Sequence, residues 1–93
     1  MTICTVIGHV WATKKEESLS GLKLMVVREE RTGRRAAKEY VAADLVGAGI
    51  GEQVLVVSGS TARVASGGNE RMVDSAIVGI IDTLEVDRER KQQ

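Results

Sequence analysis

The side chains of this chain that could do chemistry are few and widely spaced. His9 is the only histidine and Cys4 the only cysteine in 93 residues. Metal and catalytic sites combine a histidine with further ligands or bases, and the odd spacing of these two residues puts them on opposite faces of a strand. A reactive thiol also needs a neighbouring cation or helix N-terminus. We therefore expect a structural or interface role for His9 and a buried apolar role for Cys4.

Three hydroxyl side chains lie close together around Gly59. Ser58 and Ser60 flank this glycine, and Thr61 and Arg63 follow. The segment does not match the Gly-x-Ser-x-Gly pattern that exposes a nucleophilic serine. Serine and threonine hydroxyls near a turn usually bond to the local backbone. We expect such bonds here, with Ser60 as the N-cap of a short helix.

Three isolated aspartates lie near the ends of expected strands, at Asp44, Asp74 and Asp82. Acid–base catalysis commonly uses two carboxyl groups, and the sequence gives no sign that any two of these converge. We expect one or two of them to pair with Arg63 or to accept hydrogen bonds from backbone N–H groups. The chain thus offers no predicted catalytic, metal-binding or cofactor-binding residue, and we expect neither an enzyme nor a cofactor.

Three glycines alternate directly before an apolar run in the middle of the chain. Gly47, Gly49 and Gly51 precede Glu52 and the run at residues 54–57. A loop that binds phosphate normally leads into a helix, whose N–H groups face the anion, whereas this β-branched run predicts a buried strand. We therefore expect the glycines to provide tight turns or close contact between backbones, and not nucleotide binding.

Composition indicates one small β domain. Nineteen of the 93 residues are Val or Ile, which suit a pleated sheet, and Phe is absent. Thirteen basic and thirteen acidic residues cancel, so no net field attracts nucleic acid. The sequence has no visible secretory signal and no apolar run of the roughly 20 residues that span a bilayer. We expect a cytoplasmic protein without membrane contact.

The pattern of apolar residues predicts five strands, at residues 2–13, 22–28, 40–46, 53–57 and 75–86, and one helical turn at 60–65. The polar segment 14–20 is expected to be a solvated loop, and 29–38 a hairpin loop with Gly33 at its tip. Five strands without a long helix favour an OB-like barrel, and an SH3-like barrel is the alternative. We expect one domain over residues 1–86 and a polar tail over 87–93.

Basic residues cluster in the expected hairpin loop, between Arg31 and Lys38. A domain of the OB type could use such a cluster to bind single-stranded nucleic acid, together with aromatic stacking platforms. Trp11 and Tyr40 are the only Trp, Tyr or Phe residues, and glutamates flank the cluster. A solvated hairpin is favoured, and an OB-type single-stranded nucleic-acid-binding module is the alternative function.

Five segments, taken in order, resemble the pentameric vertex proteins of bacterial microcompartment shells, the EutN/CcmL family. The first, at residues 6–15, reads VIGHVWATKK, and the second, at residues 18–24, reads SLSGLKL. The central segment, at residues 42–52, reads AADLVGAGIGE. The last two read VLVVSGSTAR at residues 54–63 and VDSAIVGIID at residues 73–82. Because the five segments cover nearly the whole chain, it is identified as a member of this family.

The resemblance implies an all-β, five-stranded OB-like barrel with one short helix that assembles as a cyclic pentamer. It implies a structural role without catalysis, in which pentameric caps at the shell vertices supply the curvature that closes the shell. The implied partners are other copies of the chain and hexameric shell proteins, and the implied location is the microcompartment shell in the cytoplasm. Candidate residues for the subunit interface or an axial pore are Gly47, Gly49, Gly51, Glu52, Ser58, Gly59, Ser60, Thr61 and Arg63.

Overall fold

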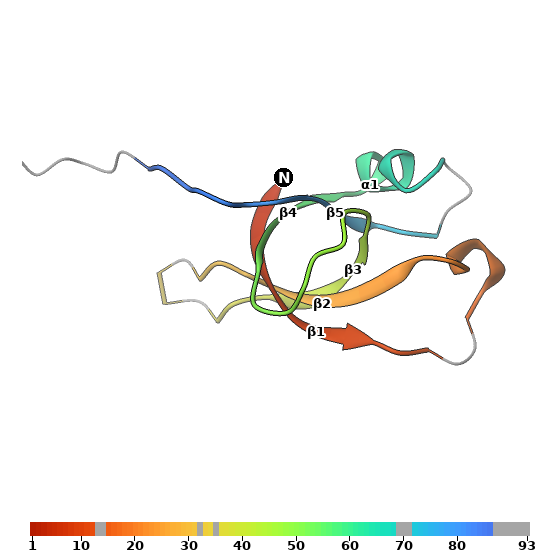
Figure 1. Ribbon diagram of the computed structural model, residues 1–93, viewed down its shortest axis with the longest axis horizontal. Helices are drawn as coiled ribbons and strands as arrows, with labels where there is room; N and C mark the ends of the chain where they lie inside the picture. Colours follow the sequence, from red (N-terminus) through yellow and green to blue (C-terminus); the bar gives the residue numbers. More distant parts are fainter. Residues whose placement is uncertain (13–14, 32, 35, 69–71, 87–93) are drawn as a thin grey trace, which may run out of the picture.

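Five β-strands close into a barrel in the computed structural model, and one short helix packs on its outside (Figure 1). The structure describes residues 1–12, 15–31, 33–34, 36–68 and 72–86. In chain order the elements are β1 (Thr2–Val10), a 3₁₀ turn (Glu17–Leu19), β2 (Lys23–Glu29), β3 (Glu39–Asp44), β4 (Gln53–Ser58), α1 (Ser60–Ala65) and β5 (Ser75–Ile80). The predicted five-stranded barrel with one short helix is confirmed.

The strands follow the order β1-β2-β3-β5-β4 around the barrel, and β4 pairs again with β1. β3 and β5 run parallel, whereas the other neighbouring strands run antiparallel. The parallel contact is short, because it joins only Ala43 with Ala76 and Asp44 with Ile77. β3 and β5 therefore lie apart over the first half of β3.

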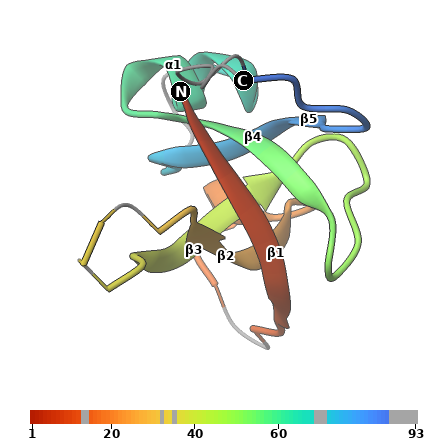
Figure 2. The ribbon, with the colours of Figure 1, turned by 90° about the vertical axis from the view of Figure 1, so that its left-hand side faces the viewer.

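Figure 2 shows how the strands wrap around the barrel interior. Aliphatic side chains fill this interior. Alternation along β1 turns Cys4 and Val6 inward. The strand shifts register between Val6 and Gly8, so the strict alternation expected from the sequence holds only up to Val6. Most core residues are β-branched or small, which suits the tight interior of a narrow barrel. The buried members are Cys4, Val6, Met25, Val27, Ala42, Ala48, Val54, Val56 and Ile77.

A second apolar cluster lies between α1 and the barrel, where the helix packs on β4 and β5 (Figure 2). Ala62 of the helix is fully buried there together with Val57 and Val73. Leu19 packs against the same cluster from the 3₁₀ turn. The expectation of a wholly solvated loop at residues 14–20 is therefore wrong for this leucine, and residue 14 lies outside the described residues.

Three strands end earlier than predicted, because a strand ends where its partner ends. β1 stops at Val10, which pairs with Leu24 beside the first residue of β2. β5 stops at Ile80, which pairs with Val54 beside the first residue of β4. β3 stops at Asp44, whose side chain redirects the backbone. These ends depend on pairing between distant segments, which the local pattern does not contain.

The helix α1 spans the predicted residues, but its N-cap is Gly59 and not Ser60. Gly59 has φ 66°, a conformation that disfavours residues with a side chain, and it makes no side-chain cap bond. Its carbonyl accepts hydrogen bonds from the N–H groups of Ala62 and Arg63. The turn into the helix therefore depends on glycine, whereas Ser60 is already the first helical residue.

Two segments project from one end of the barrel (Figure 1). The antiparallel pairing of β2 with β3 confirms the hairpin, and Gly33 has φ 62° in its loop. After β5, residues 82–86 run away from the barrel and every one of them is exposed. We call residues 82–86 the arm. The predicted tail at 87–93 and residues 32 and 35 of the hairpin loop lie outside the described residues.

Candidate functional site

The loop at residues 45–52 starts from a buried carboxylate. One oxygen of Asp44 accepts hydrogen bonds from the N–H groups of Val46 and Gly47, each at 3.1 Å, and the other from that of Ala48 at 2.9 Å. The predicted use of an aspartate to bond backbone N–H groups is thus confirmed for Asp44. Its basic neighbour is Lys23, with Nζ 3.7 Å from the carboxylate, since β2–β3 pairing places the two residues opposite each other. The alternative prediction, an ion pair with Arg63, is wrong for Asp44.

The glycines of this loop serve two different purposes. Gly47 and Gly51 have φ values of 79° and 95°, where glycine is favoured, so the predicted tight-turn role is confirmed for both. Gly49 lacks a positive φ, and its N–H donates to Glu52 Oε1 at 2.7 Å. A Cβ on Gly49 would meet only that oxygen, at 3.6 Å. The prediction that Gly49 allows close contact between backbones is therefore wrong within the chain.

The loop closes one end of the barrel against β1. The N–H of Gly51 donates to the carbonyl of Val6 at 2.8 Å, and the N–H of Val6 donates to the carbonyl of Glu52 at 3.0 Å. Ala48 is buried in the barrel core. The glycine loop thus leads into β4, as predicted, and holds no helix N-terminus that could face an anion.

The structure separates the predicted interface residues into two groups. Gly47, Gly49, Gly51 and Glu52 lie before β4, whereas the residues from Ser58 onwards lie after it or at its end. β4 has six residues and therefore separates the two groups by roughly 20 Å. All nine candidates are at least partly exposed, so both groups are accessible to a partner. The second group comprises Ser58, Gly59, Ser60, Thr61 and Arg63.

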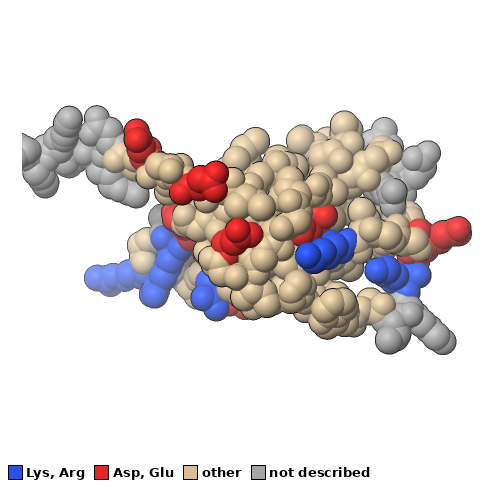
Figure 3. Space-filling view, in the orientation of Figure 1, with Lys and Arg blue, Asp and Glu red and all other residues tan. Residues whose placement is uncertain are grey.

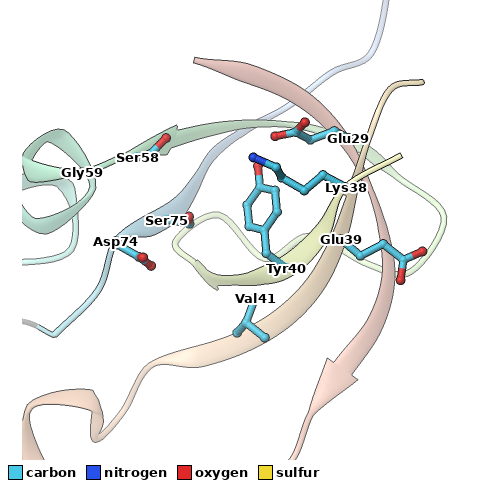
Figure 4. A pocket seen from close by; sticks show the side chains of 9 residues that line it. All are labelled: Glu29, Lys38, Glu39, Tyr40, Val41, Ser58, Gly59, Asp74 and Ser75. Carbon is cyan, nitrogen blue, oxygen red and sulfur yellow. The ribbon is translucent and has the colours of Figure 1, made fainter. Parts of the chain in front are cut away.

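A groove of about 670 Å³ lies where β3 and β5 diverge, and Figure 4 shows the side chains along it. We call it the β3–β5 groove. Tyr40 and Val41 line one side, and Asp74 and Ser75 the other, with Ser58 close by. The groove adds residues that the sequence reasoning did not single out as interface candidates. No local signal could have indicated them, because the groove exists only where two strands that are distant in sequence fail to pair.

Tyr40 connects this groove with the core. Its hydroxyl lies 3.4 Å from Cys4 Sγ, within hydrogen-bond distance. Burial raises the pKa of the Cys4 thiol, and the nearby charge of Glu29 raises it further, although the bond from Tyr40 opposes this shift. Burial and the contact with Cys4 also raise the pKa of Tyr40. The thiol is therefore protonated and shielded, in agreement with the apolar role expected for Cys4.

Outside the groove, two aromatic side chains stack at the end of β1. The ring centroids of His9 and Trp11 lie 5.4 Å apart, and the angle between the two ring planes is 24°. The prediction that His9 and Cys4 lie on opposite faces of β1 is wrong, because the strand shifts register between Val6 and Gly8. His9 therefore pairs with Met25, whose side chain points into the core as that of Cys4 does. Within the described ranges, no three His, Cys, Asp or Glu residues gather as a metal site. In the same ranges, no helix has the length and apolar character to cross a membrane.

Charge on the surface is uneven. Lys and Arg side chains gather at the end of the molecule that carries the β2–β3 hairpin, and acidic side chains lie along the arm above it (Figure 3). Arg31, Arg34 and Lys38 are exposed in the hairpin. Their glutamate neighbours include Glu39, which accepts a hydrogen bond from Arg28 at 2.9 Å. The cluster is thus a solvated hairpin with mixed charge, as favoured from the sequence.

Comparisons with known proteins identify relatives over nearly the whole chain. Residues 1–82 match the family model described as "Ethanolamine utilisation protein EutN/carboxysome". The chain is 48% identical over 88 residues to the carboxysome shell vertex protein CcmL of Synechococcus elongatus, covering 94% of this chain and 89% of CcmL. It is 43% identical over 89 residues to the microcompartment shell vertex protein PduN of Salmonella typhimurium, covering 90% of this chain and 98% of PduN.

A solved structure extends the likeness to the fold. The pentameric microcompartment shell protein GrpN from Rhodospirillum rubrum superimposes with a TM-score of 0.78 at 44% identity, covering 94% of this chain and 99% of GrpN. Sequence and fold therefore agree along the same barrel. This chain belongs to the EutN/CcmL family of microcompartment shell vertex proteins.

Proposed function

We propose that five copies of this chain form a ring that occupies the vertices of a bacterial microcompartment shell. The observation that carries the proposal is the likeness to a pentameric shell protein along the whole barrel. The relatives named as vertex proteins come from both carboxysomes and other microcompartments. The nucleic-acid-binding alternative receives no support from these relatives.

The mechanism of a vertex protein is geometrical. Hexameric shell tiles pack into flat sheets, and a closed polyhedron built from such tiles needs pentagons at its corners. A cyclic ring uses a heterologous interface, in which one surface of each copy meets a different surface of the next. The partners proposed here are therefore other copies of this chain and, around the rim of the ring, hexameric shell proteins.

The proposed ring assigns a purpose to the two groups of candidate interface residues. A heterologous interface needs two distinct surfaces on each copy, and the groups at the two ends of β4 are separated as such surfaces must be. The glycine loop with Glu52 would supply one surface or line the axis. The residues from Ser58 to Arg63, around the start of α1, would supply the other.

We further propose that the chain has no catalytic activity. Cys4 is buried and protonated, His9 stacks on Trp11, and within the described residues no three His, Cys, Asp or Glu side chains gather. Nucleophilic and acid–base catalysis need at least two such groups in contact. The protein would thus act through its shape and its surfaces.

Native mass spectrometry and sedimentation equilibrium test the ring directly. We expect a species of about five times the chain mass of 10.0 kDa at micromolar concentration, without bound nucleic acid. A stable monomer, or a monomer that retains oligonucleotide, would contradict the proposal. Deleting the gene in a host without a second vertex protein should leave elongated or open shells in electron micrographs, whereas cargo enzymes keep their activity in lysed extract.

A further inference from the structure

Among the residues that the structure describes, no strand pairs with one edge of β3 along the β3–β5 groove. The carbonyl of Lys38 accepts a hydrogen bond from β2, whereas the N–H of Leu45 donates to Ile77 of β5. Because backbone groups alternate in direction along a strand, Glu39 and Val41 also turn their N–H and C=O groups towards the β5 side. The pairing with β5 begins only at Ala43.

The segment that could have paired with this edge is engaged elsewhere. The carbonyl of Asp74, just before β5, accepts a hydrogen bond from the N–H of Gly59 at 2.9 Å. This bond holds the chain towards α1 and away from β3. We call Glu39–Val41 the open edge of β3.

The open edge lies beside exposed apolar surface. Val41 is 44% exposed and Met72 65% exposed, and a smaller hollow between them is also lined by Leu19 and Leu24. An unpaired strand edge presents a row of backbone donors and acceptors, and an extended peptide can add to it as a further strand. Apolar side chains beside the edge then contact alternate residues of the added peptide.

The arm has the properties of such a peptide. It runs away from the barrel (Figure 1), and its two apolar residues, Leu84 and Val86, alternate with polar residues as in a half-buried strand. Leu84 is nevertheless 45% exposed and Val86 53% exposed. Directly before the arm, the N–H of Ile81 donates a hydrogen bond to the carbonyl of Gln53 at 2.9 Å. The arm is thus a segment with the alternation of a strand, and it pairs with no strand among the described residues.

The geometry points to a contact between copies. We propose that the arm of one copy adds to the open edge of β3 in the groove of the next copy. The groove lies at the first residue of β5 and the arm follows its last, so the length of β5, roughly 20 Å, separates them on one chain. This inference rests on the proposed ring, in which each copy gives one arm and receives one, leaving no arm or groove free.

Cross-linking with a short bis-maleimide tests the contact. Val41→Cys combined with Leu84→Cys should give a ladder of linked chains up to the pentamer on a denaturing gel. The matched control combines Val64→Cys with Leu84→Cys, since Val64 is 67% exposed on α1 but outside the groove. The native Cys4 is fully buried and should stay unlinked. A ladder in the control alone, or only single chains in both, would overturn the proposal.

Truncation after Ile81 separates this inference from the proposed function. The barrel should fold as judged by circular dichroism, because the arm contributes nothing to its core, but sedimentation should shift from pentamer to monomer. Leu84→Asp should weaken assembly about tenfold or more, whereas Thr83→Asp, on the other face of the arm, should weaken it by less than about threefold. A truncated chain that still forms a stable ring would overturn the arm contact and leave the vertex function standing. A full-length chain that forms no ring would overturn the vertex function itself.

Discussion

The two ends of β3 carry the same chemistry in different surroundings. At its last residue, Asp44 faces Lys23 of β2 at 3.7 Å, and at its first residue Glu39 faces Arg28 of β2 at 2.9 Å. The Asp44 side chain is fully buried, whereas that of Glu39 is 48% exposed. The end with the longer ion-pair distance is thus the one that is enclosed.

Backbone groups make the difference between the two ends. Asp44 accepts three N–H bonds and lies where β3 pairs with β5, whereas Glu39 lies at the open edge beside the groove. An exposed ion pair contributes little to stability, but a buried carboxylate that satisfies several N–H groups leaves them all unpaired when it is removed. One strand thereby has a closed end that stabilises the barrel and an open end that is available to a partner.

The largest expected effect comes from removing the buried carboxylate. Asp44→Ala should lower the free energy of unfolding by about 3 kcal/mol, because three N–H groups lose their acceptor. Glu39→Ala is the matched control at the other end, and we expect it to cost less than about 0.5 kcal/mol. Urea denaturation at one fixed protein concentration measures both. Equal losses would break the proposed contrast between the ends.

A smaller effect should separate two glycines of the closed end. Gly51→Ala should cost about 1 kcal/mol, because φ is 95° there and a side chain disfavours that conformation. Gly49→Ala should change stability by less than about 0.5 kcal/mol in the isolated chain, since it lacks a positive φ and has space for a Cβ. Thermal unfolding measures both variants. A large loss of assembly in Gly49→Ala, with normal stability of the chain, would place Gly49 at the interface between copies.

The open end should respond to alkaline pH through Tyr40 and Cys4. Both groups bind their proton more tightly in the folded chain, since their pKa values are raised from ordinary values of 10.0 and 9.0. Their contribution to stability is therefore complete below about pH 9 and is lost as the pH rises through the folded pKa values. The free energy of unfolding should fall above pH 9 more steeply in the native chain than in Tyr40→Phe combined with Cys4→Ala. Parallel pH profiles would remove the proposed connection between the groove and the core.

The smallest effect concerns the two basic partners. Lys23→Ala and Arg28→Ala should each cost less than about 1 kcal/mol, because both cations are half exposed. This pair of variants asks whether Asp44 matters through its charge or through the backbone. A loss in Lys23→Ala as large as that in Asp44→Ala, measured by urea denaturation, would assign the stability of the closed end to the ion pair.

Much of the barrel followed from local pattern. The β-branched run at residues 54–57 is almost the whole of β4, and the hairpin loop around Gly33 joins two paired strands. The limits that were wrong, at Val10 and Ile80, depend on where a partner strand begins. The same holds for Gly59, since its role as N-cap depends on the turn that packs α1 against the barrel.

The sequence by itself determined the composition of the core, the positions of five strands, the glycine turns and the family. These properties depend on residues close in sequence, or on the order of segments, and both are visible in a linear chain. Only the tertiary structure decided that Lys23 faces Asp44, that the candidate interface residues form two groups, and that β3 has an open edge. The physical reason is that register and strand divergence join residues far apart in the chain, so no local pattern contains them.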